Sequence, residues 1–107
     1  MTPAKNLLEP LPEPSLEEVV TVLVANDHAR IERIVSFGQS SPDAFWYDQA
    51  ESEWVLVLQG WGTIEFENGA TQTLRTGDYL FLPAHQKHRV LATASDEPTV
   101  WLAIFIP

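Results

Sequence analysis

Cysteine is absent from this chain of 107 residues, and basic residues are few. The lack of cysteine excludes disulfides and thiolate metal sites, and it is typical of a reducing compartment. Only six lysine and arginine residues stand against fifteen acidic ones, which gives a net charge of -9. Because nucleic-acid binding depends on basic side chains that neutralise phosphates, this composition predicts no nucleic-acid partner.

Long hydrophobic runs are also missing. No apolar stretch approaches the length of a membrane-spanning helix, and the first residues lack the basic and apolar regions of a secretory signal. We therefore expect no membrane partner and a cytoplasmic location. Apolar residues make up 45% of the chain, which is enough for one domain with a modest core and argues against disorder throughout.

Four prolines mark residues 1–15 as an N-terminal arm: Pro3, Pro10, Pro12 and Pro14. Proline lacks an amide donor and fixes φ, so this spacing forbids a continuous helix or strand. The leucines of the arm can dock on the folded domain or on a partner, and a frayed terminus is the alternative. Residues 16–107 are expected to form the folded domain.

Short β-type segments separated by turn signals fill those residues. Length and β-branched or aromatic content predict strands over residues 30–35, 54–59, 63–67, 71–75, 79–82, 88–93 and 99–106. Residues 16–24 fit both a helical stripe and a strand, and their β-branched content favours a strand in a hairpin with the next segment. Such a series predicts an all-β sandwich or barrel.

Three of these segments carry more specific expectations. Asn68-Gly69 predicts a tight hairpin in which both residues take positive φ. Gly60-Trp61-Gly62 predicts a turn, and residues 79–82 predict a buried strand. In the last strand, Trp101 and Phe105 share one parity, which predicts either core or the surface of a homodimer.

Two motifs resemble those of the cupins, which are small double-stranded β-helix or jelly-roll barrels. Gly77, Pro83 and His88 stand at the spacing of the second cupin motif, and Glu53 and Gly60 match the end of the first. The resemblance covers roughly residues 30–106 and extends to small single-domain bacterial cupins, most of which lack an assigned reaction. It implies an all-β cupin barrel that carries the N-terminal arm.

The resemblance also implies a metal site. The usual His-x-His of the first motif is replaced here by Tyr47 and Gln49, or by Trp46 and Asp48. The candidate metal ligands are therefore Glu53, His88, His85, Asp48 and Gln49. Ligands of this kind without sulfur suit Zn, Mn, Fe or Ni, and open coordination positions would let the metal polarise a carbonyl or activate water or dioxygen.

Each candidate ligand has an alternative interpretation. An inward Glu53 would lie on the same strand face as Val55 and Val57 and would need a metal or a donor to neutralise it, whereas an outward Glu53 would simply face water. His88 is otherwise a hydrogen-bonded core histidine. His85 lies at the pocket rim if the chain bends after Pro83, and in an exposed loop if it does not.

The expected substrate pocket is lined or covered by three consecutive aromatic residues, Phe45, Trp46 and Tyr47, unless they only pack the loop. Two functions are favoured, and a pure assembly module is a weaker third. One is a metal-binding cupin that acts on or binds a small polar molecule inside the barrel, by oxygenation, isomerisation or hydrolysis. The other is a metal-free module that binds a small ligand without catalysis. Nucleophilic catalysis has no support, because cysteine is absent and no serine stands in a Gly-x-Ser-x-Gly motif.

Overall fold

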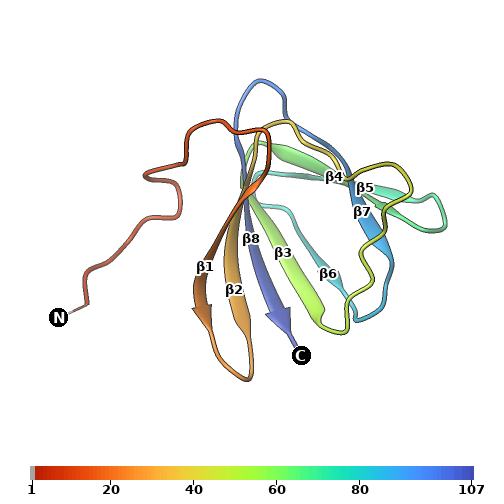
Figure 1. Cartoon of the computed structure of the whole chain (residues 1–107), viewed down its shortest axis with the longest axis horizontal. Coiled ribbons are helices and arrows are strands. Elements are labelled where there is room, and N and C mark those ends of the chain that lie inside the picture. The colour runs from red at the N-terminus through yellow and green to blue at the C-terminus, as the bar shows by residue number, and fades with distance from the viewer. Residues whose placement is uncertain (1) are drawn as a thin grey trace.

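A computed structural model describes residues 2–107 and consists of two antiparallel β-sheets (Figure 1). Its strands are β1 (Val19–Ala25), β2 (Arg30–Ser36), β3 (Ser52–Gln59), β4 (Trp61–Phe66), β5 (Thr71–Arg75), β6 (Tyr79–Leu82), β7 (His88–Thr93) and β8 (Thr99–Ile106). One sheet has the strand order β1-β2-β8-β3-β6, and the other has the order β5-β4-β7. The predicted all-β jelly roll is confirmed.

The core lies between the two sheets. Side chains alternate along each strand, so Val55 and Val57 of β3 and Trp101 of β8 point inward together. Ile64 and Leu74 close the core from the smaller sheet. Each fully buried side chain of this kind contributes about 1.5–3 kcal/mol, and this burial holds the sheets face to face. Within residues 2–107, no helix has the length and hydrophobicity needed to cross a lipid bilayer.

Strand β6 differs from its predicted burial. Leu82 is buried, whereas Tyr79 and Phe81 are 67% and 53% exposed. The reason is that β6 lies at the edge of the larger sheet and pairs only with β3. Only one side of that sheet faces the core, so alternate residues of β6 face outward.

The turn predicted at Gly60-Trp61-Gly62 is confined to Gly60, which has a φ of 76°. Trp61 and Gly62 already belong to β4, where Gly62 pairs with Leu74 on one side and Thr93 on the other. A Cβ atom at Gly62 would lie 2.3 Å from two carbons of the Trp101 ring. Gly62 is therefore required by the packing of Trp101 and not by a turn.

Asn68 and Gly69 connect β4 to β5, but their geometry differs from the expected two-residue turn. Gly69 has a φ of 89°, and Asn68 does not have a positive φ. The amide of Phe66 donates to the carbonyl of Ala70, and the amide of Ala70 donates to the side chain of Asn68. The loop therefore spans four residues and needs only one glycine.

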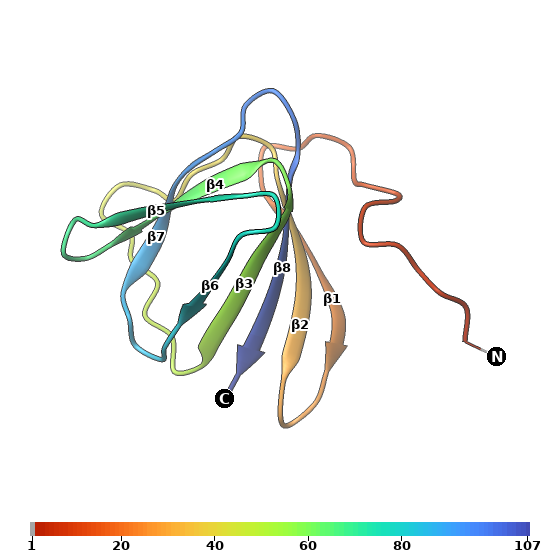
Figure 2. The ribbon, with the colours of Figure 1, turned by 180° about the vertical axis from the view of Figure 1, so that it is seen from behind.

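The segment that precedes β1 extends past the edge of the barrel (Figure 2). Nη1 of Arg33, on β2, donates to the carbonyl oxygens of Leu7 and Pro10 at 3.3 and 3.2 Å. The side chain of Gln39 donates to the carbonyl of Ser15 at 2.9 Å. These bonds attach the arm to β2 and to the loop that follows it, before the chain enters β1.

Candidate functional site

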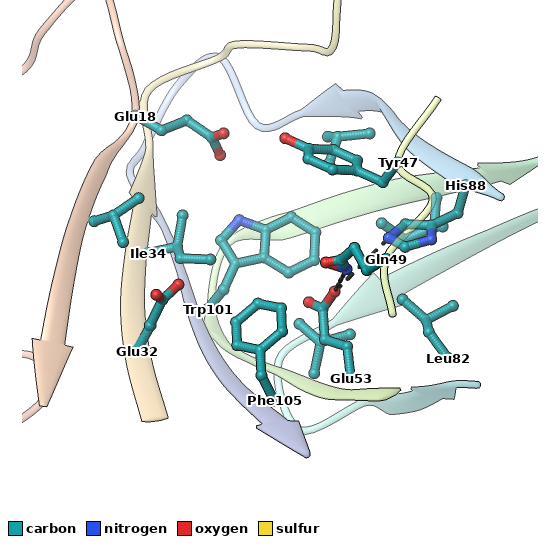
Figure 3. Close-up of a pocket in the computed structure, with 14 residues that line it drawn as sticks. Glu18, Glu32, Ile34, Tyr47, Gln49, Glu53, Leu82, His88, Trp101 and Phe105 are labelled. Carbon is teal, nitrogen blue, oxygen red and sulfur yellow. Dashed lines mark hydrogen bonds and ion pairs between the residues drawn. The ribbon is translucent and has the colours of Figure 1, made fainter. Parts of the chain in front are cut away.

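A cavity of about 190 Å³ lies between the two sheets (Figure 3). Most of its wall is apolar and comes from both sheets, and includes Val20, Ile34, Val55, Val90, Trp101 and Phe105. Its polar lining residues are Glu18, Glu32, Tyr47, Gln49, Glu53 and His88. An apolar hollow with a few convergent polar groups is the usual form of a small-molecule site.

Glu53 and His88 meet in this cavity. Glu53 lies on β3, between its partners Leu82 on β6 and Phe105 on β8, and His88 begins β7 on the opposite sheet. Nε2 of His88 is 3.7 Å from Oε1 of Glu53, and the two side chains are only 7% and 12% exposed. The fold thus brings together the acid of the first motif and the histidine of the second.

The orientation of the His88 ring is determined by Gln86. Nδ1 of His88 lies 2.9 Å from the carbonyl oxygen of Gln86, which can only accept, so Nδ1 carries a proton. In the neutral ring, Nε2 is then an acceptor that faces the Glu53 carboxylate. The distance of 3.7 Å is longer than an ordinary hydrogen bond, and the contact becomes favourable when Nε2 is protonated.

This arrangement changes the pKa of His88. Burial of the ring lowers the pKa, but the Glu53 carboxylate and the Gln86 carbonyl favour the charged ring and outweigh burial. The net result is a pKa above the ordinary value of 6.5. A proton, or a donor supplied by a ligand, is therefore favoured between Nε2 and the carboxylate.

Gln49 and Tyr47 complete this end of the cavity. Nε2 of Gln49 donates to Oε1 of Glu53 at 3.2 Å, the same oxygen that faces His88. The main chain of Tyr47 pairs with that of His88 through two hydrogen bonds of 2.8 and 3.2 Å, and the two rings stack with centroids 5.5 Å apart. Burial, with the charges of Glu18 and Glu53, raises the pKa of Tyr47 above 10.0. Its hydroxyl therefore remains a neutral donor at ordinary pH.

Two of the predicted ligands, His85 and Asp48, lie outside the cavity. Nδ1 of His85 is 2.8 Å from Oδ1 of Asp48, and these side chains are 70% and 43% exposed. His85 has a φ of 64°, and neither residue lines the cavity. The turn after Pro83 thus separates His85 from His88 and pairs it with Asp48 at the surface.

Of the three aromatic residues expected at the mouth, Tyr47 lines the cavity and the other two pack around it. The ring of Phe45 meets that of Tyr47 edge-on at a centroid distance of 4.9 Å. The ring of Trp46 lies 5.3 Å from the guanidinium of Arg89. Phe45 and Trp46 therefore support the loop that carries Tyr47 and do not form the wall of the cavity.

Glu18 and Glu32 line the cavity although the sequence motifs do not indicate them. In Figure 3 they lie across the cavity from Glu53. Glu32 shares the strand parity of Ile34, which is a signal that they face the same side, but alternation alone does not say which side is interior. Glu18 lies just before β1 and no sequence pattern marks it.

A hydrogen-bonded chain connects Glu18 to the wall of the cavity. The hydroxyl of Ser36 donates to the carboxylate of Glu18, and Nε1 of Trp101 donates to the oxygen of Ser36 at 3.0 Å. Ser36 and Trp101 are both buried. The indole ring that forms part of the wall is thus held in one orientation by a bond inside the core.

The donors that converge in the cavity are fewer than a catalytic metal site usually has. Glu53 and His88 are the two strong donors that converge in the cavity, and Gln49 adds only a neutral amide. Within residues 2–107, no three His, Cys, Asp or Glu side chains come together as a metal site requires. Catalytic zinc sites usually have three protein ligands of these types, so this set is one short.

Comparison with known proteins identifies the family. The Cupin domain family matches residues 34–105, which include both motifs and the residues at the Glu53–His88 end of the cavity. The chain belongs to the cupin family. No curated protein matches the chain.

Several solved structures share the fold. A protein of Ralstonia eutropha JMP134, provisionally named a mannose-6-phosphate isomerase, is 42% identical over 98% of both chains, with a TM-score of 0.93. A conserved Klebsiella pneumoniae subsp. pneumoniae MGH 78578 protein with a double-stranded β-helix domain is 17% identical, covers 100% of this chain and 91% of its own, and has a TM-score of 0.80. A cupin superfamily protein of Desulfitobacterium hafniense DCB-2 is 21% identical, covers 90% and 83%, and has a TM-score of 0.74. The last two show the fold alone.

Proposed function

We propose that the chain binds a small molecule in the cavity between its sheets, with Glu53 and His88 as the polar end of the site and without a resident metal. The observation that carries this proposal is the meeting of a nearly buried carboxylate and a nearly buried imidazole in a cavity that is otherwise mostly apolar. Buried groups of this kind are costly unless they have partners. A ligand that supplies those partners explains why they converge.

The volume of the cavity limits the size of the ligand. An apolar protein cavity of about 150 Å³ holds benzene. The cavity here, of about 190 Å³, accommodates a six-membered ring with one or two small substituents. The apolar wall would hold the body of the molecule, and Glu53, His88 and Tyr47 would orient a polar substituent.

A neutral ring molecule, cyclohexanol, tests the proposal by NMR titration. With about seven heavy atoms at roughly -0.6 kcal/mol each, a Kd of about 1 mM is expected. Val20→Trp places a large side chain at the rim of the cavity, where Val20 is 53% exposed. Val24→Trp, on the same strand and similarly exposed, does not line the cavity and is the matched control.

We expect wild type and Val24→Trp to bind cyclohexanol equally and Val20→Trp to bind at least tenfold more weakly. Chemical-shift changes in wild type should cluster on β3, β7 and β8. Equal binding by all three proteins, or changes confined to residues outside the cavity, would contradict the proposal.

A second candidate is a cupin that holds Zn, Mn, Fe or Ni through Glu53, His88 and Gln49. The close approach of Nε2 and Oε1 favours it. Elemental analysis of untagged protein, purified without a chelator, distinguishes the candidates. Stoichiometric metal that is lost in Glu53→Ala and His88→Ala supports a metal site, and metal-free protein whose Tm is unchanged by added Zn²⁺ supports the metal-free site.

We also propose that the chain forms a homodimer through the outer face of the larger sheet. Phe81 of β6 and Ile106 of β8 are exposed there, and the ring of Trp54 packs against Tyr79 at a centroid distance of 5.4 Å. Contiguous apolar side chains on a sheet face favour contact with a second copy.

A further inference from the structure

The charged side chains that line the cavity all have the same sign when His88 is neutral. Glu18, Glu32 and Glu53 contribute carboxylates, and among residues 2–107 no lysine or arginine lines the cavity. We infer, on the basis of the proposed small-molecule function, that the ligand is an organic cation: a protonated amine on a small apolar ring or chain. The ammonium group would lie at the Glu53–His88 end.

The protein's own groups leave the negative charge at the cavity largely uncompensated. Glu53 accepts from the neutral amide of Gln49, and Glu18 accepts from the neutral hydroxyl of Ser36. Arg30 pairs with Glu32 at 2.8 Å, but the same guanidinium also binds Glu51 at 3.0 Å. One guanidinium cannot neutralise two carboxylates.

The Glu53–His88 end lacks a donor from His88 whenever the ring is neutral. Nδ1 of His88 is occupied by the carbonyl of Gln86, so the lone pair of Nε2 faces the cavity. The oxygen 3.7 Å away, on Glu53, is also an acceptor. An ammonium group has three donors and a positive charge, and it can bond to both acceptors at once.

The aromatic walls suit the same ligand. The rings of Trp101, Phe105 and Tyr47 line the cavity, and the faces of such rings attract cations. One face of the Phe105 ring is already covered by the guanidinium of Arg30, 4.3 Å from its centroid, so a ligand cation would use the rings of Trp101 and Tyr47. The aromatic and apolar walls would therefore contact the ring or chain of the ligand, and the carboxylates would bind its ammonium group.

A phosphorylated sugar, which the name of the Ralstonia relative suggests, fits this cavity poorly. Phosphate groups are usually bound by arginine, lysine or the amide groups at the N-terminus of a helix. The cavity offers none of these within residues 2–107 and presents three carboxylates instead. A dianionic phosphate would be repelled by each of them.

Four probes test the inference by NMR titration at pH 8.5, where an alkylamine with a pKa near that of lysine, about 10.4, keeps its proton. Cyclohexylammonium, cyclohexanol and cyclohexanecarboxylate share one ring and differ in charge, and mannose 6-phosphate is the fourth. The proteins are wild type, Glu53→Gln, Glu32→Gln and the control Glu67→Gln. Glu67 is exposed, pairs with Lys87 and does not line the cavity.

We expect cyclohexylammonium to bind wild type at least tenfold more tightly than cyclohexanol, and no binding of the carboxylate or of mannose 6-phosphate. Glu53→Gln should weaken cyclohexylammonium at least tenfold and Glu32→Gln two- to fivefold. Both variants should weaken cyclohexanol less than cyclohexylammonium, because glutamine keeps a hydrogen-bond acceptor and loses only the charge. Glu67→Gln should match wild type, and circular dichroism melting of each variant verifies that it is folded.

The outcomes separate this inference from the proposed function. If cyclohexanol binds in the cavity as tightly as cyclohexylammonium, the preference for a cation is wrong and the cavity remains a binding site. If mannose 6-phosphate binds and Val20→Trp abolishes that binding, the preference for a cation is also wrong and the cavity is still a binding site. If none of the ring probes binds, both the inference and the proposed function are overturned.

Discussion

Replacing Gly62 with alanine should destabilise the fold through a single contact with Trp101. The added Cβ would lie 2.3 Å from Cη2 and Cζ2 of the indole, whereas carbon atoms in contact are normally about 3.5–4.0 Å apart. Something must therefore move by about 1.2 Å or more. Gly62 is paired on both sides within β4, so its main chain has little freedom, and the ring of Trp101 must shift.

The expected cost follows from what holds the ring. Trp101 is 3% exposed, and overpacking a core of this kind costs about 1–3 kcal/mol. The shift also breaks the 3.0 Å bond from Nε1 to Ser36, which adds about 1 kcal/mol. Alanine gains at most about 1 kcal/mol over glycine in a strand, so the net loss is about 2 kcal/mol. For a domain of this size the Tm should fall by roughly 10 °C.

A double-mutant cycle with Trp101→Phe isolates the contact. Phenylalanine lacks the two carbons that meet the Cβ, so Gly62→Ala should cost less than about 0.5 kcal/mol in that background. Urea unfolding of the four proteins measures the coupling. An equal cost of Gly62→Ala with Trp101 and with phenylalanine would refute the reasoning.

Three other variants test separate parts of the structure. Glu53 helps to raise the pKa of His88, so the charged ring stabilises the fold fully below pH 6.5, and this stability is lost as pH rises through the folded pKa. The Tm of wild type should therefore fall more between pH 6 and 9 than the Tm of Glu53→Gln. Parallel curves of Tm against pH for the two proteins would contradict this. Phe81→Lys should be a monomer in analytical ultracentrifugation at concentrations where wild type is a dimer, because Phe81 is exposed on the proposed interface. At dilutions where both proteins are monomers, their Tm values should be equal. A monomeric wild type would overturn the dimer proposal. Asp48→Asn should lower the free energy of unfolding by less than about 1 kcal/mol, because its partner His85 is exposed. Cyclohexanol binding and metal content should not change, because both residues lie outside the cavity. A loss of bound metal would instead make Asp48 a ligand.

Local patterns in the sequence account for most of the fold. β-branched content and turn residues predict the strands because those properties depend on neighbours along the chain. They do not predict that Gly62 is a packing residue, because its clash partner, Trp101, lies in a distant strand. They also do not predict which face of β6 is exposed, because this depends on its position at the edge of the sheet.

The residues of the site are also only partly predicted by the sequence. Glu53 and His88 are found by the spacing of their motifs. Glu32 is not, because strand alternation groups it with Ile34 without saying that this face borders a cavity. His85 and Asp48 have the chemistry of ligands, but His85 itself is left-handed and points to the surface, and Pro-Ala-His has no glycine or asparagine to mark that conformation.

The most direct test of the binding site is the ¹⁵N chemical shift of the His88 ring nitrogens during titration with cyclohexylammonium at pH 8.5. We predict that Nε2 of His88 shifts on binding, while Nδ1 remains protonated by its bond to Gln86 and the exposed His85 and His28 are unchanged. If the probe binds while His88 is unaffected, or if only His85 responds, the imidazole and the carboxylate of Glu53 do not face the ligand.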